Sequence, residues 1–391
     1  MKIQLWSYNY APEPTGIGPV SATFARAMRA RGHELEVIAA HPHYPEPLWG
    51  KRRRPYSETL DGIPVRRLPL WIGRGSAGER IRQEASFAAS QWLALPRLGR
   101  CDAVIAVSPC FPALSAAVAN KRLRGVPWVL WLQDILPDGA VSTGIVREGP
   151  TVWAGRRLER AAYRSADKIA VISKNFERNL LSKGVPREKL AVIYNPATRP
   201  ILDAPRGRPA GQPPSILVMG NIGHSQGLPE LVRSFEASQK LAAIGARLVV
   251  TGTGVAAAEV AAAVTGDRVE LLGLVSDERL VEQLERASIG LVTQRSDVAE
   301  FNLPSKLMNY CARGLPVVAA VPERSETAEL VRSTGCGWVV DRDADVGDVI
   351  ADALGDPDQL AVRGESGRSF AGERLGADAL AAQFESLIAS I

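Results

Sequence analysis

A lysine at the start of an expected helix is one of the residues best placed to bind an anion. Lys306 lies in the stretch LPSKLMNYCARGLPVVAA, where a short helical pattern ends at a glycine and an apolar strand follows. Its ammonium can meet a phosphate as a compact positive charge. We expect Ser305 to cap the helix and this helix start to face a ligand, although a surface helix would also tolerate a lysine here. The residues assigned to a ligand in this stretch are Leu303, Pro304, Ser305, Lys306 and Asn309.

Two glycine-containing loops lie between an expected strand and an expected helix. The first is EPTGIGPVS, Glu13–Ser21, with its helix expected from about Pro19, and the second is MGNIGHSQGLPEL, Met219–Leu231. A helix start presents free N–H groups to an anion. Either loop alone is equally well explained as a tight turn, and neither matches the dinucleotide or Walker patterns. Two such loops together favour a shared diphosphate site. The residues assigned to it are Gly16, Gly18, Asn221, Gly223 and Gln226.

Two other strand ends carry residues that could touch a ligand. Gly252 lies in TGTG, where we favour a simple turn but keep the glycine among the ligand-site residues. Gln133 and Asp134 end the apolar run WVLWL. A carboxylate there could orient a substrate hydroxyl group, and an aspartate that caps the next turn is the alternative.

The four histidines do not form a metal cluster. His41 and His43 lie two residues apart in HPHYPEP, together with Tyr44. That spacing could bind a metal, but we interpret the segment as a loop that lines a substrate. No order of Ser, His and Asp or of Cys and His stands out as a nucleophilic catalyst, and we expect no metal site.

Composition indicates a globular chain of more than one domain. Its 391 residues are 46% hydrophobic and 23% charged, which is more chain than one ordinary core accommodates. The four cysteines show no paired spacing, so we expect neither disulfides nor zinc and favour a reducing cytoplasm. The first residues do not form a signal-peptide pattern, and no stretch has the composition of a transmembrane helix.

The net charge of +5 is unevenly distributed along the sequence. Residues 51–100 hold 11 lysines and arginines against 4 acidic residues, a local charge of +7. A solvated surface explains this equally well. The functional interpretation is peripheral contact with anionic lipid at the inner face of the plasma membrane, or with a phosphorylated acceptor. No nucleic-acid-binding module is visible, so nucleic acid is not an expected partner.

Short apolar runs alternate with helical patterns, which predicts parallel sheets covered on both faces. A Pro-, Gly- and Arg-rich segment separates two such series. The fold class is therefore α/β, with two doubly wound, Rossmann-like domains facing a central cleft. The expected division is 1–197, a linker at 198–214, 215–372, and a C-terminal helix at 373–391 that could cross back to the first domain. The expected strands are IQLWSY, LEVIAA, DAVIAVS, PWVLWL and KIAVIS, then SILVMG, ARLVVTG, RVELLG, SIGLVT, LPVVAAV and CGWVV.

These loops resemble those of the family-4 retaining glycosyltransferases of the GT-B fold, and most of all the colanic-acid and O-antigen biosynthesis type. The resemblance covers nearly the full length. It rests on YNYAPEPTGIGPVSATFARAMRARGHELEVI, WVLWLQDILPD, GNIGHSQGLPELVRSF and LPSKLMNYCARGLPVV, in the expected order.

The chain departs from the wider family at its charged positions. Typical members carry Arg and Lys where this chain has Asn221 and Gln226, and Glu where it has Asn309. Glu300 is the nearest candidate for the other family Glu, with eight residues instead of seven before Asn309. A His often stands at the position of Gln133. The resemblance therefore implies a rearranged diphosphate clamp in which Lys306 replaces the lost charges; an inactive chain is the alternative.

The resemblance implies transfer of a sugar, an N-acetylhexosamine or a deoxyhexose, from a UDP-sugar to a hydroxyl or phosphate-linked acceptor, with retention and without a cofactor. GDP is the alternative nucleotide, and the acceptor is lipid-linked or a small molecule. Three alternatives remain open: a natural-product glycosyltransferase, a nucleotide-sugar epimerase of the same architecture, and a non-catalytic binding protein. The implied roles are catalysis for Asp134, Lys306 and Gln133, the acceptor side for His41, His43 and Tyr44, and donor binding for Glu300, Gly252 and the other loop residues named above.

Overall fold

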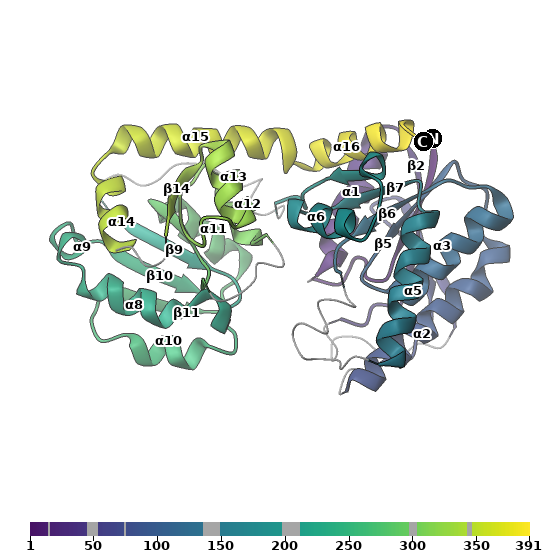
Figure 1. Cartoon of the computed structure of the whole chain (residues 1–391), viewed down its shortest axis with the longest axis horizontal. Coiled ribbons are helices and arrows are strands. Elements are labelled where there is room, and N and C mark those ends of the chain that lie inside the picture. The colour runs from purple at the N-terminus through teal and green to yellow at the C-terminus, as the bar shows by residue number, and fades with distance from the viewer. Residues whose placement is uncertain are drawn as a thin grey trace. The chain divides into compact units, whose positions relative to one another are not determined.

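The chain forms two compact units in a computed structural model (Figure 1). Unit 1 comprises Met1–Asn195 and Ala377–Ile391, and unit 2 comprises Pro196–Gly376. Each unit is a mostly parallel sheet with helices on its faces, as the apolar runs predict. The structure describes residues 1–14, 16–44, 54–73, 76–135, 149–197, 212–296, 303–341 and 346–391.

The sheet of unit 1 has eight strands in the order β3-β4-β2-β1-β5-β6-β7-β8. All neighbours pair in parallel except β3 and β4, which form an antiparallel hairpin. The sequence predicted the five central strands but neither the hairpin nor β8. The strands are β1 (Lys2–Ser7), β2 (Glu34–Ala40), β3 (Tyr56–Leu60), β4 (Ile63–Leu68), β5 (Ala103–Val107), β6 (Trp128–Leu132), β7 (Lys168–Val171) and β8 (Leu190–Val192).

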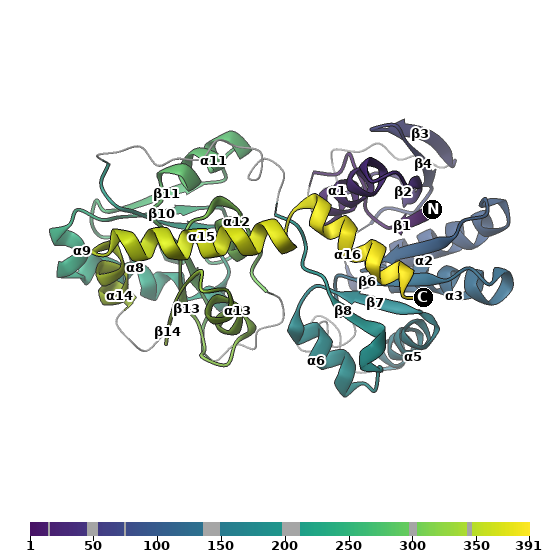
Figure 2. The ribbon, with the colours of Figure 1, turned by 90° about the horizontal axis from the view of Figure 1, so that it is seen from above.

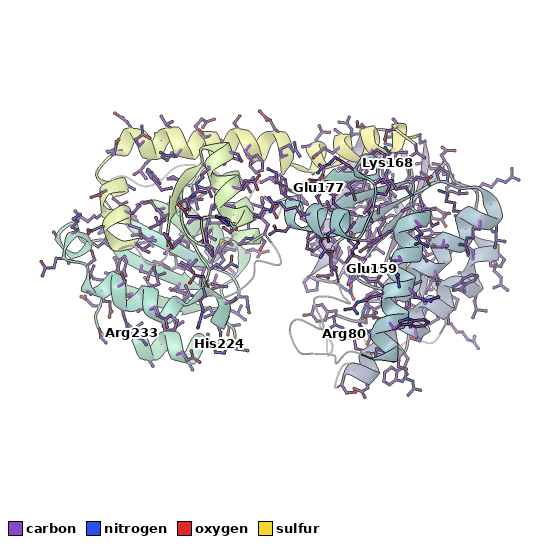
Figure 3. All side chains as sticks on the ribbon, in the orientation of Figure 1. Arg80, Glu159, Lys168, Glu177, His224 and Arg233 are labelled. Atoms are coloured by element: carbon purple, nitrogen blue, oxygen red, sulfur yellow. The ribbon has the colours of Figure 1, made fainter. Side chains whose placement is uncertain are left out.

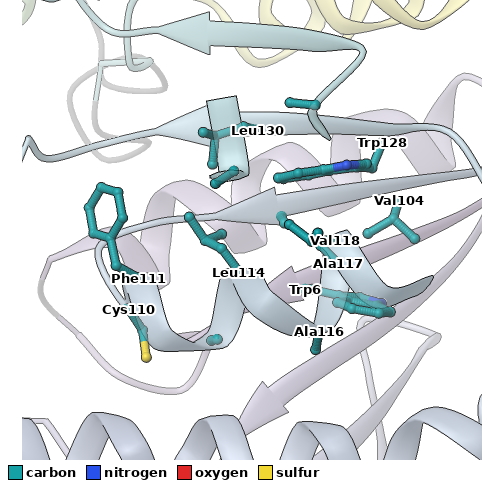
Figure 4. Packing of buried hydrophobic residues seen from close by; sticks show 14 of the residues in the cluster. Trp6, Val104, Cys110, Phe111, Leu114, Ala116, Ala117, Val118, Trp128 and Leu130 are labelled. Carbon is teal, nitrogen blue, oxygen red and sulfur yellow. The ribbon is translucent and has the colours of Figure 1, made fainter. Parts of the chain in front are cut away.

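Successive residues of the central strands point to opposite faces, and both faces are apolar. Trp6, Val104 and Trp128 pack on one face, where Figure 4 shows helix α3 against the strands. Leu5 and Trp131 pack on the other face with α1 and α16. The helices of the unit are α1 (Ile17–Ala30), α2 (Ala77–Ala94), α3 (Phe111–Arg124), α5 (Pro150–Ser165), α6 (Lys174–Ser182) and α16 (Ala377–Ala389), with short 3-10 turns at η1 (Leu95–Arg97) and η2 (Arg187–Lys189).

The C-terminal helix α16 belongs to unit 1 and lies beside α1 (Figure 2). The ring of Phe384 lies 4.8 Å from that of Phe24 and 4.9 Å from that of Trp131, both edge-on. At the surface Arg31 pairs with Asp378 at 2.7 Å. Aromatic pairs of this geometry add about 0.5–1.5 kcal/mol each beyond their buried area. The helix is therefore part of the core of unit 1.

Unit 2 has a six-stranded sheet in the order β11-β10-β9-β12-β13-β14, and the sequence predicted all six strands. The pairing is parallel throughout. The strands are β9 (Ser215–Met219), β10 (Arg247–Thr251), β11 (Val269–Gly273), β12 (Ile289–Thr293), β13 (Val317–Ala320) and β14 (Gly337–Val340). The helices are η3 (His224–Gln226), α8 (Leu228–Ala237), α9 (Gln239–Ala243), α10 (Ala257–Ala263), α11 (Asp277–Arg286), α12 (Ser305–Arg313), α13 (Glu326–Thr334), α14 (Val346–Leu354) and α15 (Pro357–Arg374).

The described basic residues of the segment 51–100 do not all lie at the surface. Arg67 on β4 is fully buried and bonds to the Glu58 carboxylate at 2.7 Å and to the Ala40 carbonyl at 3.1 Å. Arg66 donates to the Arg97 carbonyl at 3.1 Å. The expectation of a basic surface is therefore wrong for Arg67, because its charge is used to fix the hairpin to the sheet. No helix in the described ranges is long and apolar enough to cross a membrane.

Candidate active site

Polar residues gather at the carboxyl ends of both sheets. The strand order reverses between β1 and β5 in unit 1, and between β9 and β12 in unit 2. Ligands of open α/β sheets bind outside the carboxyl ends of the strands at such switch points. Most of the residues assigned from the sequence follow these strands or their neighbours. Each unit thus offers one candidate binding region.

In unit 2, the loop after β9 is held by the loop after β10. The Gly220 N–H donates to the Thr251 carbonyl at 3.0 Å, and the Ile222 N–H donates to the Thr253 carbonyl at 2.9 Å. A Cβ on Gly252, whose φ is +126°, would lie 1.8 Å from the Gly220 carbonyl oxygen. Only glycine allows this backbone approach. The TGTG turn therefore supports the first glycine loop, while contact between Gly252 and a donor stays a prediction.

Lys306 lies beside this loop and is nearly buried. Its side chain comes from the first turn of α12, the residue is 8% exposed, and its Cε lies 3.9 Å from the Cβ position of Gly220. Burial lowers the pKa of the Lys306 ammonium to about 8. Nζ donates to the Gln226 side-chain oxygen at 3.2 Å. No carboxylate of the described residues pairs with Nζ, and its partner is a neutral amide.

Helix α12 is fixed to the sheet by Tyr310. The Tyr310 hydroxyl donates to the Leu217 carbonyl at 2.9 Å and accepts the Met219 N–H at 3.2 Å. The expectation that Ser305 caps the helix is wrong, because Pro304 occupies the N-cap position and no side chain caps the helix. The Leu307 N–H donates to the Pro304 carbonyl at 3.0 Å, whereas no described backbone carbonyl accepts the Ser305 and Lys306 N–H groups, which can therefore face solvent or a ligand. Asn309 is buried one turn beyond Lys306 and has a hydrogen-bonding or electrostatic partner.

The remaining residues of the second glycine loop lie close to Lys306. Gln226 ends η3 and donates from Nε2 to the Asn221 carbonyl. The Cβ position of Gly223 lies 3.3 Å from the Asn221 side-chain amide. His224, labelled in Figure 3, lies on the exposed side of the turn, with Nδ1 3.6 Å from Glu259. The structure therefore brings Asn221, Gly223, Gln226 and Lys306 together. Leu303 and Pro304 directly precede α12, and Glu300 lies outside the described residues.

Sequence reasoning missed polar residues at two other strand ends of unit 2. Thr293 ends β12 with its hydroxyl buried and without a hydrogen-bond partner. Glu326 and Thr327 begin α13 after β13, and both are buried. The sequence signal that could have found them is the SET stretch, residues 325–327. Its serine is a typical helix N-cap, and Ser325 caps α13 by accepting the Ala328 N–H at 3.1 Å. Buried polar residues at the first turn of a helix, beside the switch point, are candidates for ligand contact.

In unit 1, the first glycine loop leads into α1, which begins at Ile17 and not near Pro19 as expected. Gly16 is the N-cap with φ +69°, and nothing lies within 4 Å of its Cβ position. A Cβ on Gly18 would lie 3.1 Å from the Glu13 carbonyl oxygen. Gly16 thus leaves open space at the start of α1, whereas a side chain at Gly18 would crowd the Glu13 carbonyl. An anion contact at Gly16 stays a prediction.

Glu13 is a functional candidate that the sequence reasoning quoted without giving it a role. Its buried Oε1 accepts the N–H groups of His43 at 2.7 Å and Tyr44 at 2.9 Å, and its Oε2 accepts the Asn9 amide at 2.8 Å. Burial raises the pKa of the Glu13 carboxyl, and these three hydrogen bonds oppose the shift. Glu13 therefore ties the glycine loop to the segment after β2.

The three residues assigned to the acceptor side have different exposures. His41 and His43 are both buried, and His43 Nδ1 lies 2.9 Å from the His41 carbonyl oxygen. Tyr44 is exposed. The two histidines therefore shape the loop from inside, and Tyr44 is the exposed member of the set; its contact with an acceptor stays a prediction. In the described ranges no group of His, Cys, Asp and Glu could hold a metal ion.

Gln133 and Asp134 directly follow β6 and differ in their surroundings. The Gln133 amide exchanges two hydrogen bonds with that of Asn195, at 3.0 and 2.7 Å. Asp134 is half-buried, and burial raises the pKa of its carboxyl while Arg80 opposes the shift. Arg80, labelled in Figure 3, comes from the first turns of α2. No donor from the described residues bonds to the Asp134 carboxylate, which is thus available to a substrate hydroxyl group.

Residues 15–196 match the family description "Glycosyl transferase 4-like domain", and residues 213–356 match "Glycosyl transferases group 1". Together with the two Rossmann-like units, these matches show that the chain belongs to the glycosyltransferases of the GT-B fold. The chain is an enzyme of the transferase class, and the family resemblance found in the sequence is confirmed.

Among individual proteins, the chain is similar to WcaI of Escherichia coli strain K12, named as a colanic acid biosynthesis glycosyl transferase. The identity is 29% over 354 residues, which covers 84% of this chain and 86% of WcaI. It is also similar to the glycosyltransferase WbjE of Pseudomonas aeruginosa, with 25% identity over 58% of each chain. The structure of HepE from Anabaena in complex with UDP matches with a TM-score of 0.70, 16% identity and full coverage of both chains. At that identity the likeness shows the fold.

Proposed function

We propose that the chain transfers a sugar from a UDP-sugar to a hydroxyl or phosphate-linked acceptor, with retention at the anomeric carbon. The observation that carries the proposal is Lys306, a nearly buried ammonium beside the Gly220 loop whose described hydrogen-bond partner is the neutral Gln226 amide. A buried charge without a counter-charge is costly. A bound diphosphate would supply two negative charges at this position. Its attraction to the ammonium would offset the cost of burying Lys306 and favour binding.

The geometry of unit 2 suits the leaving group of the reaction. Negative charge grows on the diphosphate as the bond to the anomeric carbon breaks. Lys306 can stabilise that charge together with the positive N-terminal ends of the dipoles of α12 and α8. Fixed donors of this kind need no reorganisation during the reaction. The residues present therefore support transfer without a metal ion.

We assign binding of the acceptor to unit 1. The Asp134 carboxylate has a raised pKa and no described hydrogen-bond donor, so it can orient an acceptor hydroxyl group. The hydrogen bonds between the Gln133 and Asn195 side chains fix the position of Gln133, and with it the backbone of the next residue, Asp134. Tyr44 offers an exposed ring from the neighbouring loop. We assign Asp134 to catalysis, and Gln133 to positioning.

The named relatives support the class of product and the nucleotide. WcaI is named for colanic acid biosynthesis, and the structure of WaaG is described as that of a glycosyltransferase involved in lipopolysaccharide biosynthesis. HepE binds UDP in its structure. We therefore propose a UDP-sugar donor carrying an N-acetylhexosamine or a deoxyhexose, and an acceptor in cell-surface polysaccharide or glycolipid synthesis.

The test combines UDP calorimetry with turnover of a UDP-sugar panel on a lipid-linked acceptor. Lys306→Ala is expected to lower turnover about a hundredfold, because a hydrogen-bonded charge is removed where negative charge develops. The matched control is Lys240→Ala, a lysine of the same unit that pairs with Asp348 at the surface. Equal effects of the two substitutions, or none from Lys306→Ala, would refute the assignment. A sugar-nucleotide product formed without acceptor would identify an epimerase instead.

A further inference from the structure

Ser108 joins the ends of strands β5 and β6 through its side chain. It directly follows β5 and is fully buried, and its Oγ accepts the N–H groups of Gln133 at 2.8 Å and Asp134 at 3.4 Å. Its own backbone N–H donates to the Trp131 carbonyl at 3.1 Å. The two strands lie side by side in unit 1 (Figure 1). Ser108 therefore holds the backbone that carries the Asp134 carboxylate.

The Ser108 hydroxyl takes the place of a backbone carbonyl at the end of the sheet. The register of β5 and β6 pairs Val107 with Trp131. A continued parallel ladder would next join the Gln133 N–H to the Ser108 carbonyl. The structure uses the Ser108 side chain instead, and the same oxygen also accepts the next N–H along the chain. The course of the backbone after β6 therefore depends on one side chain.

A second buried serine in the same sheet has the more usual role. Ser173 lies shortly after β7 and is fully buried, and its Oγ caps α6 by accepting the Phe176 N–H at 3.1 Å. Ser108 likewise lies between a strand and a helix, but no side chain caps the following helix α3. The Ser108 hydroxyl thus serves the neighbouring strand end and not the helix that follows it in the sequence.

The Asp134 carboxylate depends on its backbone for its position. No donor among the described residues bonds to this carboxylate, and Arg80 of α2 is the described charge that acts on it. Burial raises the pKa of the Asp134 carboxyl, and Arg80 opposes the shift. The preceding Gln133 is fixed by the Asn195 side chain. Among the described contacts, the Asp134 N–H itself bonds to the Ser108 hydroxyl.

We propose that Ser108 is a positioning residue that keeps the Asp134 carboxylate where it orients the acceptor hydroxyl group. The inference rests on the proposed function, because it takes Asp134 as the catalytic carboxylate of unit 1. Ser108 contacts no substrate and acts through the backbone of Gln133 and Asp134. Small displacements of a catalytic group lower the rate strongly. Loss of the hydroxyl should therefore affect the use of the acceptor and leave donor binding by unit 2 unchanged.

The test compares Ser108→Ala with Ser173→Ala in the full chain. Each variant removes a buried hydroxyl that accepts backbone N–H groups at a strand end of unit 1, and urea unfolding measures the loss of stability in both. Turnover is measured with a UDP-sugar and a lipid-linked acceptor, and UDP affinity by calorimetry. Ser108→Ala should lower kcat/KM for the acceptor about tenfold with UDP affinity unchanged, whereas Ser173→Ala should change neither. Ser108→Thr keeps the acceptor oxygen and should restore most of the rate.

The pH profile separates positioning from a purely structural role. The kcat/KM for the acceptor should fall on the acid side as Asp134 becomes protonated, and burial moves this acid limb above the ordinary pKa of an aspartate. In Ser108→Ala the released carboxyl is better solvated, so its pKa should fall and the acid limb should move to lower pH. Ser173→Ala should keep the wild-type limb.

Asp134→Asn distinguishes failure of this inference from failure of the proposed function. If Asp134→Asn loses turnover but Ser108→Ala matches Ser173→Ala in rate and acid limb, the inference is wrong and the proposed function stands. If Asp134→Asn keeps the wild-type rate, both are wrong.

A double variant gives a second measure of the same inference. Ser108→Ala combined with Asp134→Asn should lose no more turnover than Asp134→Asn alone, because the two residues act as one unit. Additive losses would overturn the inference. Ser108→Cys has a similar shape but a weak acceptor, and it takes the place of Ser108→Ala in every comparison if the alanine variant does not fold.

Discussion

The Lys306 ammonium lies 3.2 Å from the Gln226 side-chain oxygen, which links the start of α12 to the loop after β9. In the wider family, the resemblance places a lysine at the position of Gln226 and an arginine at that of Asn221. In the described part of this chain, the cation beside that loop is Lys306, which comes from α12.

The first prediction tests whether the positive charge can be moved from position 306 to positions 221 and 226, where the wider family carries it. In the Lys306→Ala background, Asn221→Arg with Gln226→Lys is expected to raise UDP affinity about tenfold above that of Lys306→Ala alone, because charged groups again face the diphosphate. Calorimetric titration with UDP measures the effect. A triple variant that binds UDP no better than Lys306→Ala would show that the start of α12 and the loop after β9 do not share one diphosphate site.

Donor binding should depend on pH through Lys306. The pKa of about 8 means that the free protein loses the cationic form as the pH rises through that value. UDP affinity should therefore fall about tenfold from roughly pH 7 to roughly pH 9. Lys306→Arg stays charged and should bind UDP with little pH dependence, although more weakly at neutral pH. If wild type and Lys306→Arg show the same slope, another group is responsible.

Gly252→Ala should displace the donor loop. The new Cβ would lie 1.8 Å from the Gly220 carbonyl oxygen at a φ of +126°. We expect a loss of about 3 kcal/mol in the free energy of unfolding, from overpacking and backbone strain. Gly245→Ala is the control, with φ +62° and nothing within 4 Å, and should cost about 1 kcal/mol. Urea unfolding compares them, and equal losses would contradict the steric explanation.

Glu13→Ala should destabilise unit 1 by about 3 kcal/mol, because the buried His43 N–H, the partly buried Tyr44 N–H and the Asn9 amide lose their acceptor. Glu13→Gln should cost less, since its oxygen can still accept the His43 and Tyr44 N–H groups. Glu278→Ala, at an exposed position of α11, is a control expected to change stability by less than about 0.5 kcal/mol. Chemical denaturation followed by tryptophan fluorescence measures all three. If Glu13→Ala is as stable as the wild type, Glu13 does not position the loop.

Turnover should continue in excess EDTA. In the proposed site, Lys306 and the N-terminal ends of α8 and α12 supply the positive potential for the diphosphate. The measurement is initial rate with and without chelator at saturating donor. Activity that disappears in EDTA and returns with magnesium or manganese would contradict a metal-independent site.

The parallel strands were readable from the sequence because both of their faces are buried. Runs such as WVLWL and SIGLVT are apolar without interruption, which is typical of central strands between helix layers. The hairpin β3–β4 was not readable, since Glu58, Arg66 and Arg67 interrupt its pattern. The charge of Arg67 is satisfied by groups from three other segments, and no local pattern reveals such partners.

The candidate site was predictable where function depends on local features. Lys306 at a helix start and the two glycine loops follow from residue type and position. The cap assigned to Ser305 failed because the helix begins one residue earlier than a serine N-cap requires. Glu13 was missed for a different reason. Its partners His43 and Tyr44 come from the segment after β2, so its role becomes visible only in three dimensions.

Helix α16 has a consequence for synthesis of the protein. The ribosome delivers Phe24 and Trp131 before unit 2, but Phe384 of α16, which packs on both rings, only after it. Unit 1 therefore cannot complete its core during translation until the whole of unit 2 has emerged. A chain that stops before residue 377 leaves these aromatic rings uncovered, so the cell meets every incomplete product as a molecule with an exposed apolar surface.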